Sequence, residues 1–450
     1  MLSLALRAYC LVDSGLNLDE MVALNAVKNL GFENLFFDNH PPMYLIFLKI
    51  SCAIFGYNEF SARLPSVFFS AATTGAIGFM LLRQGIDKMW VFAGMFCHAM
   101  FPLSLEYAQQ ARPYAIFEFF SVIQFTLYLD FIKKPAESLL RKRLIIASFL
   151  TTLSSYLAAL LFVFEWAFSF KKNKNIFAVV AINIFLIGLI VVSKEFVDWK
   201  YLDWQVTKYN LETLAFLPID VVKVYSYYSA LSGLGVLGIL FIYLSTLDQE
   251  KIKSFFGPML MAFSILFLFI GFSLVSRRAI FSPRYFIFLM PVYFNFLTHS
   301  CQQIVYFIKE SLVKKILFYS CCLLLVLGMG LTLRDFYPQR QAKWREAADT
   351  ISTYSNSVVL TTSYLALKTP YFDNKGISVL GVEDPAKILS QLEQLLQTYD
   401  NVWILDTYWN YIAYMPSQLS AIKTAALKIN DFTEFEKGRE TVAVVRISKK

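Results

Sequence analysis

Residues 61–82 read SARLPSVFFSAATTGAIGFMLL, and Arg63 is the one charged side chain among them. A helix needs roughly 20 mostly apolar residues to cross a bilayer, so this stretch predicts a membrane span. Similar stretches recur along the chain. We expect further spans near 89–105, 113–132, 176–193, 222–246, 257–275, 284–305 and 314–333. The sequence therefore predicts a polytopic, all-α membrane protein.

The composition of the whole chain agrees with this fold class. Of the 450 residues, 57% are hydrophobic and 16% are charged, whereas soluble proteins carry about 25% charged residues. A soluble core cannot hide so much apolar surface, and a disordered chain would be polar and highly charged. The composition therefore excludes both classes and makes the lipid bilayer the expected surroundings of most of the chain.

Three apolar segments depart from a simple span. Residues 2–12 are too short to cross, and we expect them to be the end of a first helix. Residues 40–55 are interrupted by Lys49 and predict a helix that lies at the membrane interface. Residues 144–170 suit either one tilted helix or two short helices that meet at Ser154-Ser155-Tyr156.

Basic residues determine the expected orientation, because Lys and Arg gather in cytoplasmic loops. The loop residues concerned are Arg83, Lys88, Lys133, Lys134, Arg141, Lys142, Arg143, Lys171, Lys172, Lys174, Lys251, Lys253, Lys309, Lys314 and Lys315. They fall on one side only if 144–170 crosses twice and 40–55 does not cross, which gives about eleven spans in all. The outer side then receives the loops at 19–20, 106–112, 194–221 and 276–283 and the C-terminal segment. The basic residues of the cytoplasmic loops explain the net charge of +8, so we expect no nucleic-acid partner.

Residues 336–450 have a different character, with more charge and with amphipathic patterns in place of apolar runs. The apolar runs at 358–360, 402–405 and 442–445 predict strands. Residues 385–399 predict a helix, since apolar side chains recur there at helical spacing. Strands that alternate with helices predict a small soluble α/β domain. We therefore expect two domains, a transmembrane domain over 1–335 and an extracytoplasmic domain over 336–450.

Two outer loops carry side chains suited to acid–base and phosphate chemistry. Asp19 and Glu20 could supply a general base, which must lie within reach of the proton that it takes. The alternative is a solvated loop or a helix cap, with residues 18–20 opening the helix that follows. Residues 106–114 read EYAQQARPY, and the planar fork of Arg112 suits a phosphate. The alternative there is an interfacial anchor, with Arg and Tyr at the level of the lipid headgroups.

Two further segments contain candidate ligands. Asp38 and His40 could contact a phosphate or hold a divalent metal, although two ligands do not make a metal site. The alternative is a capped helix start, since two prolines suit a first helical turn. A cationic cluster on the outer side consists of Arg277, Arg278 and Arg284-Tyr285. Its anionic partner could be a phospholipid headgroup or a lipid-linked phosphate.

Several kinds of site are excluded or disfavoured. The chain has no Gly-rich phosphate loop with its Lys-Ser/Thr, so a Walker ATPase is not expected. Three histidines exclude a His-rich metal site, and we expect His98 and His299 to be packed or hydrogen-bonded inside spans. The six cysteines show no spacing typical of a disulfide framework or a metal site.

In their order along residues 13–345, these pieces resemble the GT-C class of bacterial membrane glycosyltransferases. The resemblance is to the group similar to dolichyl-phosphate-mannose protein mannosyltransferases and aminoarabinose transferases. The matching pieces are Asp19-Glu20, HPPMY at 40–44, FSARLPS at 60–66, QQARPY at 109–114, PRY at 283–285 and Trp344-Arg345. The resemblance implies the GT-C fold. It also implies transfer of a sugar from a polyprenyl phosphate to a cell-envelope acceptor, on the outer face of the bacterial inner membrane.

The resemblance also implies roles for individual residues. Asp19, with Glu20 beside it, matches the catalytic acid position. The family often has Glu where Gln110 stands, and Glu106, one helical turn earlier, could replace it. The positions expected near the donor phosphate are His40, Arg112, Tyr114, Arg284 and Tyr285. Many relatives have Thr-His-Tyr where Ser154-Ser155-Tyr156 stand, so this chain lacks one potential ligand of a divalent metal.

Two other classes of function remain as alternatives to the transferase. A transporter or flippase of lipid-linked saccharides should show internal repeats with paired broken helices, and the sequence shows no such repeat. A non-catalytic envelope protein whose C-terminal domain binds a partner would tolerate the loss of Asp19, whereas the enzyme would not.

Overall fold

The computed structural model divides into two compact units. It describes residues 1–12, 15–29, 31, 42–155, 157–158, 161–162, 165, 230–246, 287–308, 311–336, 344–362, 371–372, 375–382, 388–409, 428–435 and 440–448. The first, here called the helical unit, comprises Met1–Tyr9, Leu30–Gly56 and Ser61–Leu333. The second, the sheet unit, comprises Cys10–Asn29, Tyr57–Phe60 and Arg334–Lys450.

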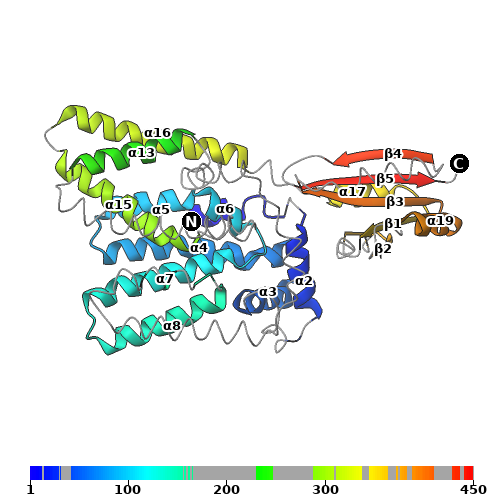
Figure 1. Cartoon of the computed structure of the whole chain (residues 1–450), viewed down its shortest axis with the longest axis horizontal. Coiled ribbons are helices and arrows are strands. Elements are labelled where there is room, and N and C mark those ends of the chain that lie inside the picture. The colour runs from blue at the N-terminus through cyan, green and yellow to red at the C-terminus, as the bar shows by residue number, and fades with distance from the viewer. Residues whose placement is uncertain are drawn as a thin grey trace, which may run out of the picture. The chain divides into compact units, whose positions relative to one another are not determined.

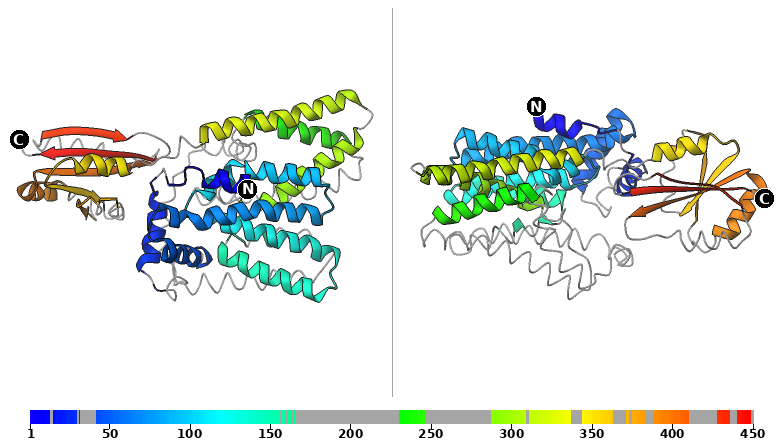
Figure 2. Two further views of the ribbon diagram at one scale, coloured as in Figure 1. Left: turned by 180° about the vertical axis from the view of Figure 1, so that it is seen from behind. Right: turned by 90° about the horizontal axis from the view of Figure 1, so that it is seen from above.

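The helical unit is built from long helices that run roughly alongside one another (Figures 1 and 2). Its described helices are α1 (Leu2–Ala8), α3 (Pro42–Phe55), α4 (Glu59–Arg83), α5 (Lys88–Ala99), α6 (Pro102–Ala108), α7 (Tyr114–Lys133), α8 (Ser138–Ser154), α13 (Ala230–Thr246), α15 (Met290–Phe307) and α16 (Leu312–Phe336). The first two residues of α4 and the last three of α16 belong to the sheet unit.

Three described helices are long and apolar enough to span a membrane by length and composition. They are α4, α7 and residues 312–334 of α16. A fourth span is available if α5 and α6, which are bent by 55°, count as one. The spans expected at 61–82, 113–132 and 314–333 are therefore confirmed as helices. Those expected at 176–193 and 257–275 lie outside the described residues, as do the first parts of those expected at 222–246 and 284–305.

The span expected at 89–105 is broken rather than continuous. Pro102 stands at the first position of α6, where its missing N–H costs nothing. The residue before a proline is disfavoured in the helical conformation, and Phe101 has extended angles of φ −70° and ψ 117°. The bend is thus encoded at Phe101-Pro102, which the sequence analysis did not single out.

Helix α8 begins earlier than the sequence predicted. Helix α8 starts at Ser138, so Arg141, Lys142 and Arg143 lie in its first turns and not in a loop. It ends at Ser154, and Ser155 has an extended backbone with φ −164° and ψ 138°. The helix therefore stops at the position where one of the two alternatives for 144–170 placed the meeting of two short helices.

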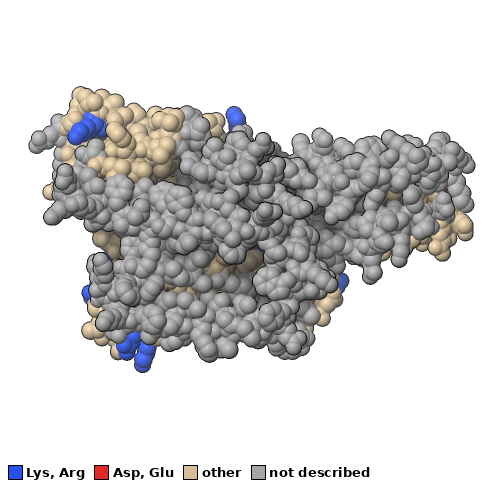
Figure 3. All heavy atoms as spheres, in the orientation of Figure 1, with Lys and Arg blue, Asp and Glu red and all other residues tan. Residues whose placement is uncertain are grey.

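The basic connections of the helical unit lie at one of its ends. The α4–α5, α7–α8 and α15–α16 connections share that end in both views (Figures 1 and 2). Lys133 donates to the Gln84 side chain at 2.8 Å, and the Asp87 backbone N–H donates to Gln302 at 2.8 Å. Figure 3 shows basic side chains at the end where α8 and α16 begin. The 109–113 turn precedes α7 and so lies at the opposite end.

The sheet unit contains a five-stranded sheet in the order β2-β1-β3-β5-β4. Its strands are β1 (Ser357–Thr362), β2 (Ser378–Val382), β3 (Asn401–Trp409), β4 (Lys428–Phe435) and β5 (Glu440–Ser448). Strand β1 pairs parallel with β2 and β3, whereas β5 pairs antiparallel with β3 and β4. The strands expected at 358–360, 402–405 and 442–445 are confirmed.

Helices α17 (Trp344–Ser352) and α19 (Ile388–Thr398) cover opposite faces of this sheet (Figure 2, right). Val359 and Trp403 are opposite each other in the ladder and pack with Ala347, Ala348 and Ile351 of α17. Since successive strand residues face opposite ways, the other face is left for α19. The helix expected at 385–399 is described from Ile388 to Thr398.

Close packing between α13 and α16 gives a first prediction. A Cβ added at Gly235 would lie 2.6 Å from the backbone oxygen of Cys321, whereas one added at Gly75 would meet nothing within 4 Å. Overpacking costs about 1–3 kcal/mol, and alanine is otherwise preferred to glycine in a helix. We expect Gly235→Ala to lower the thermal unfolding midpoint in detergent and Gly75→Ala to leave or raise it. Equal midpoints for the two variants would contradict this packing.

Candidate functional site

The two candidate acids of the first loop open helix α2 (Leu18–Asn29) in the sheet unit. The Asn17 side-chain oxygen accepts from the Glu20 backbone N–H at 2.9 Å, and the Glu20 carboxylate accepts from the Asn17 N–H at 2.8 Å. This is a reciprocal capping box, which satisfies two N–H groups that a helix start leaves unpaired. The helix-cap alternative is thus correct for Glu20.

Asp19 and Glu20 differ in their exposure and in their hydrogen bonds to the start of α2. Glu20 is buried, with 1% of its surface exposed, and its carboxylate has a backbone partner. Asp19 stands one residue earlier in the same first turn and is half-buried. Of the two acids, Asp19 is the one whose side chain does not close the capping box, so it is the better candidate for taking a proton from a substrate.

The second candidate loop connects α6 to α7 in the helical unit. The Arg112 backbone N–H donates to the Gln110 carbonyl at 2.8 Å, which makes a tight turn. The Ser66 hydroxyl of α4 donates to the Arg112 carbonyl at 3.3 Å. The turn brings Gln110, Arg112 and Tyr114 together, all half-buried, whereas Glu106 is 6% exposed and lies within α6.

Aromatic rings support the Arg112 guanidinium. Its Cζ lies 5.8 Å from the centroid of the Tyr114 ring, within the range of a cation–π contact. The Tyr114 ring is in turn 4.6 Å from the Tyr107 ring. The guanidinium is planar and always charged, so it keeps its positive charge at the end of the unit that lies opposite the basic loops.

Gln109 connects this turn to the first helix. Its side-chain nitrogen donates to the Tyr9 carbonyl at 2.8 Å and to the Arg7 carbonyl at 3.1 Å. These carbonyls belong to the C-terminal end of α1, where a helix leaves carbonyl groups unpaired. Gln109 therefore caps α1, although the sequence analysis assigned it no role.

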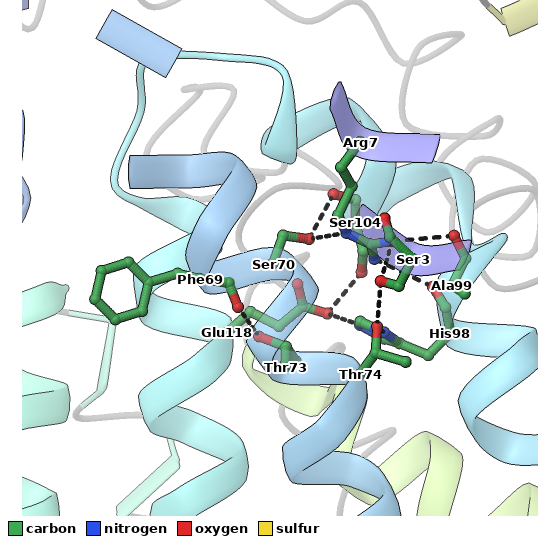
Figure 4. A network of polar contacts seen from close by, with 10 residues as sticks. All are labelled: Ser3, Arg7, Phe69, Ser70, Thr73, Thr74, His98, Ala99, Ser104 and Glu118. Carbon is green, nitrogen blue, oxygen red and sulfur yellow. Dashed lines mark hydrogen bonds and ion pairs between the residues drawn. The ribbon is translucent and has the colours of Figure 1, made fainter. Parts of the chain in front are cut away.

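The Arg7 side chain is itself fully buried and caps a second helix. Its guanidinium donates to the Ala99 carbonyl at 3.1 Å and the His98 carbonyl at 3.4 Å, at the end of α5 (Figure 4). It also donates to the hydroxyls of Ser70 at 2.6 Å and Ser3 at 2.7 Å. A cation is favourable at a helix C-terminus, so Arg7 stabilises α5 where the chain bends toward α6.

A chain of hydrogen bonds runs from Arg7 to a buried carboxylate (Figure 4). Ser3 and Thr74 hydroxyls are 2.7 Å apart, Thr74 and His98 Nδ1 are 2.8 Å apart, and His98 Nε2 is 3.1 Å from Glu118. The Ser104 hydroxyl also donates to Glu118, at 2.6 Å. Arg can only donate and a carboxylate only accept, so the chain runs in one direction with the His98 proton on Nε2. The expectation that His98 is packed or hydrogen-bonded is confirmed, since both ring nitrogens have partners.

The sequence analysis did not single out Arg7 and Glu118. Both were detectable, because each is an ionisable residue within an apolar segment, and such residues are costly at membrane depth unless they are paired or functional. Their partners were not detectable, because the hydrogen-bonded groups come from α1, α4, α5, α6 and α7.

Other predicted site residues lie outside the described part of the chain. They are Asp38, His40, Tyr156, Arg277, Arg278, Arg284 and Tyr285. Within the described residues, no group of three or more His, Cys, Asp or Glu side chains could hold a metal ion. Ser154 and Ser155 are described and buried, and neither is a typical metal ligand.

Comparisons with known proteins support the fold. No family model matches the chain, and no curated protein matches it. ArnT from Cupriavidus metallidurans in the apo state matches with a TM-score of 0.61 and 12% identity, over 97% of this chain and 95% of that one. The same protein bound to undecaprenyl phosphate matches with a TM-score of 0.61 and 13% identity, over 99% and 96%. The Archaeoglobus fulgidus oligosaccharyltransferase in complex with Zn and sulfate matches with a TM-score of 0.53 and 13% identity, over 90% and 66%.

These likenesses extend over nearly the whole chain. The solved structures are those of GT-C proteins. The chain therefore has the GT-C fold that its sequence motifs led us to expect.

The Arg7 network gives a second prediction. Arg7→Met would leave two hydroxyls (Ser3, Ser70) and three carbonyls (Ser3, His98, Ala99) without their buried donor. Each buried polar group left without its hydrogen-bond partner costs about 1–3 kcal/mol, so we expect a large loss of thermal stability in detergent. Arg141→Met is the control, since Arg141 is exposed on α8. A similar small effect of both changes would show that the network contributes little.

Proposed function

We propose that the chain is an integral membrane glycosyltransferase that moves a sugar from a polyprenyl phosphate to a cell-envelope acceptor. The observation that carries the proposal is the GT-C fold over 97% of the chain. One protein of this fold was solved with undecaprenyl phosphate bound, which makes a lipid carrier of this kind the natural donor to test. The acceptor is a lipopolysaccharide, another glycan, a lipid or a protein.

The proposed reaction needs a base for the acceptor and positive charge for the leaving group. The Asp19 carboxylate takes the proton of the acceptor hydroxyl, and that oxygen attacks the anomeric carbon. The bond between the anomeric carbon and the phosphate oxygen breaks, and its electron pair goes to the lipid phosphate. Arg112 pairs with that phosphate, and Tyr114 and Gln110 supply hydrogen-bonding groups beside it. The configuration of the sugar is inverted.

The proposal assigns supporting roles to further residues. Glu20 holds the start of α2 through its capping box, and buried Glu106 lies one helical turn before Gln110. His40, Arg284 and Tyr285, which are outside the described residues, would contact the donor phosphate. Asp38 and His40, which are outside the described residues as well, are the residues that would hold a divalent metal.

The proposal includes a topology. About eleven spans in the bacterial inner membrane place the basic connections in the cytoplasm. The 109–113 turn then faces outward, because it lies at the opposite end of the helical unit. Residues 1–335 would form the transmembrane catalytic domain and 336–450 the extracytoplasmic domain.

Asp19 gives the test of the chemical step. We expect Asp19→Asn to lower the rate of sugar transfer in membranes by about 10²–10⁴-fold, the usual contribution of a general base. Lipid-linked sugar should accumulate at the same time. The control is Asp349→Asn, which makes the same change of charge in an exposed ion pair with Lys375 of the same unit.

The outcomes separate the proposal from its rivals. Unchanged transfer in Asp19→Asn at matched protein levels would contradict the role of Asp19 as the base. Lipid-linked sugar that crosses the membrane only when the protein is present would instead indicate a flippase. If deletion of the protein changed the cell envelope but Asp19→Asn did not, the result would indicate a binding role for the C-terminal segment.

Arg112 gives the test of donor binding. We expect Arg112→Met to weaken binding of undecaprenyl phosphate to the purified protein by about 10–100-fold, the value of hydrogen bonds to a charged group. Arg141→Met, on an exposed part of α8, should bind as tightly as the parent. If the Arg112→Met variant bound undecaprenyl phosphate as tightly as the parent protein, Arg112 would not be a ligand of the phosphate.

A further inference from the structure

Tyr371 joins two distant segments of the sheet unit. Its hydroxyl accepts from the Leu16 backbone N–H at 2.7 Å and donates to a Glu59 carboxylate oxygen at 3.0 Å. Both bonds are of good length, and the second has a charged acceptor, which strengthens it. A hydroxyl that donates to a carboxylate is also a better acceptor for its other partner, since hydrogen bonds in a chain polarise one another.

The Tyr371 side chain is held by the core of the unit. The next residue, Phe372, is fully buried in a cluster with Ile351, Val359 and Trp403. Tyr371 itself packs against the same cluster. The place of its hydroxyl is therefore determined by the packing of α17, β1 and β3.

The Tyr371 hydroxyl satisfies the hydrogen bond of a buried backbone N–H, that of Leu16. Leu16 is 3% exposed, and a buried backbone N–H without a partner is costly. Leu16 directly precedes Asn17, the residue that begins the capping box of α2. Met21 is 2% exposed and stands where a hydrophobic staple would place a partner for Leu16. The start of α2 is thus fixed at two consecutive N–H groups, by Tyr371 and by Glu20.

We propose that Tyr371 is a positioning residue for Asp19. Asp19 lies three residues after Leu16, in the first turn of α2. A displacement of about 1 Å at a catalytic group can cost 10²-fold in rate, so the single hydroxyl of Tyr371 is enough to affect transfer. The inference rests on the proposed function, since it concerns the base of that reaction. It makes the C-terminal segment a part of the catalytic apparatus, through the helix that carries Asp19.

The test compares Tyr371→Phe with a matched control. Tyr399→Phe removes the hydroxyl of another half-buried tyrosine of the unit, and that hydroxyl has no hydrogen bond to the described residues. In Tyr371→Phe we expect the rate of sugar transfer in membranes to fall about 10–100-fold. Binding of undecaprenyl phosphate to the purified protein should stay within about twofold of the parent, because that ligand does not involve the base. Tyr399→Phe should change neither.

Hydrogen exchange gives a second measurement that is independent of activity. The Leu16 amide should exchange at least about tenfold faster in Tyr371→Phe, since its hydrogen-bond partner is lost. Unchanged exchange would overturn the contact. Faster exchange together with unchanged transfer would overturn the positioning role. If Asp19→Asn also left transfer unchanged, the proposed function would fail while the contact stood.

Two further comparisons distinguish positioning from general stability. If Tyr371 acts through Asp19, adding Tyr371→Phe to Asp19→Asn should lower transfer no further, because the two effects are not additive. A full additional loss in the double variant would overturn the inference. Glu59→Gln keeps an acceptor oxygen for the tyrosine and should retain transfer, whereas Glu59→Leu removes it and should resemble Tyr371→Phe. Equal loss in both Glu59 variants would also count against it.

Discussion

The hydrogen bonds of the buried Arg7 guanidinium are the interaction on which the packing of the described helices of the helical unit depends. A charge away from water is tolerable only when all its hydrogen bonds are made. Arg7 makes its bonds to α4 and to the end of α5, and the hydroxyls that follow lead to Glu118 on α7. Each hydroxyl accepts from one neighbour and donates to the next, so the loss of one link leaves polar groups unpaired. Four helices are thereby fixed in register.

This constraint extends from the network to the proposed site. Arg7 holds the end of α5, and Pro102 then turns the chain into α6. Gln109 returns to cap α1, and the Gln110–Arg112 turn follows directly. The start of α2 is determined in a similar way, by Glu20 and by Tyr371. The groups proposed to act in transfer thus stand at helix ends, and the start of α2 that carries Asp19 is held by side-chain hydrogen bonds from Glu20 and Tyr371.

The sequence predicted features that depend on local pattern and missed those that depend on tertiary contact. Apolar length was enough for α4 and α7, and short apolar runs were enough for β1, β3 and β5. Strands β2 and β4 are the edges of the sheet. Strand β4 was missed because polar residues such as Lys428 and Asp431 interrupt its pattern. Strand β2 was missed because it is five residues long and Gly381 interrupts its apolar run. Asp19 and Arg112 were proposed as site residues from sequence motifs, and their roles stay predictions. Arg7, Gln109 and Tyr371 could not be given roles, because their partners are far away along the chain.

The most direct measurement of the central claim is a joint analysis of envelope glycans and lipid carriers from cells with and without the protein. A polyprenyl-phosphate-dependent transferase couples the two, because the sugar that the acceptor gains is the one that the carrier loses. The account predicts that removal of the protein abolishes one sugar of one envelope component and that the same sugar accumulates on a polyprenyl phosphate. Unchanged glycans together with unchanged lipid carriers would contradict it.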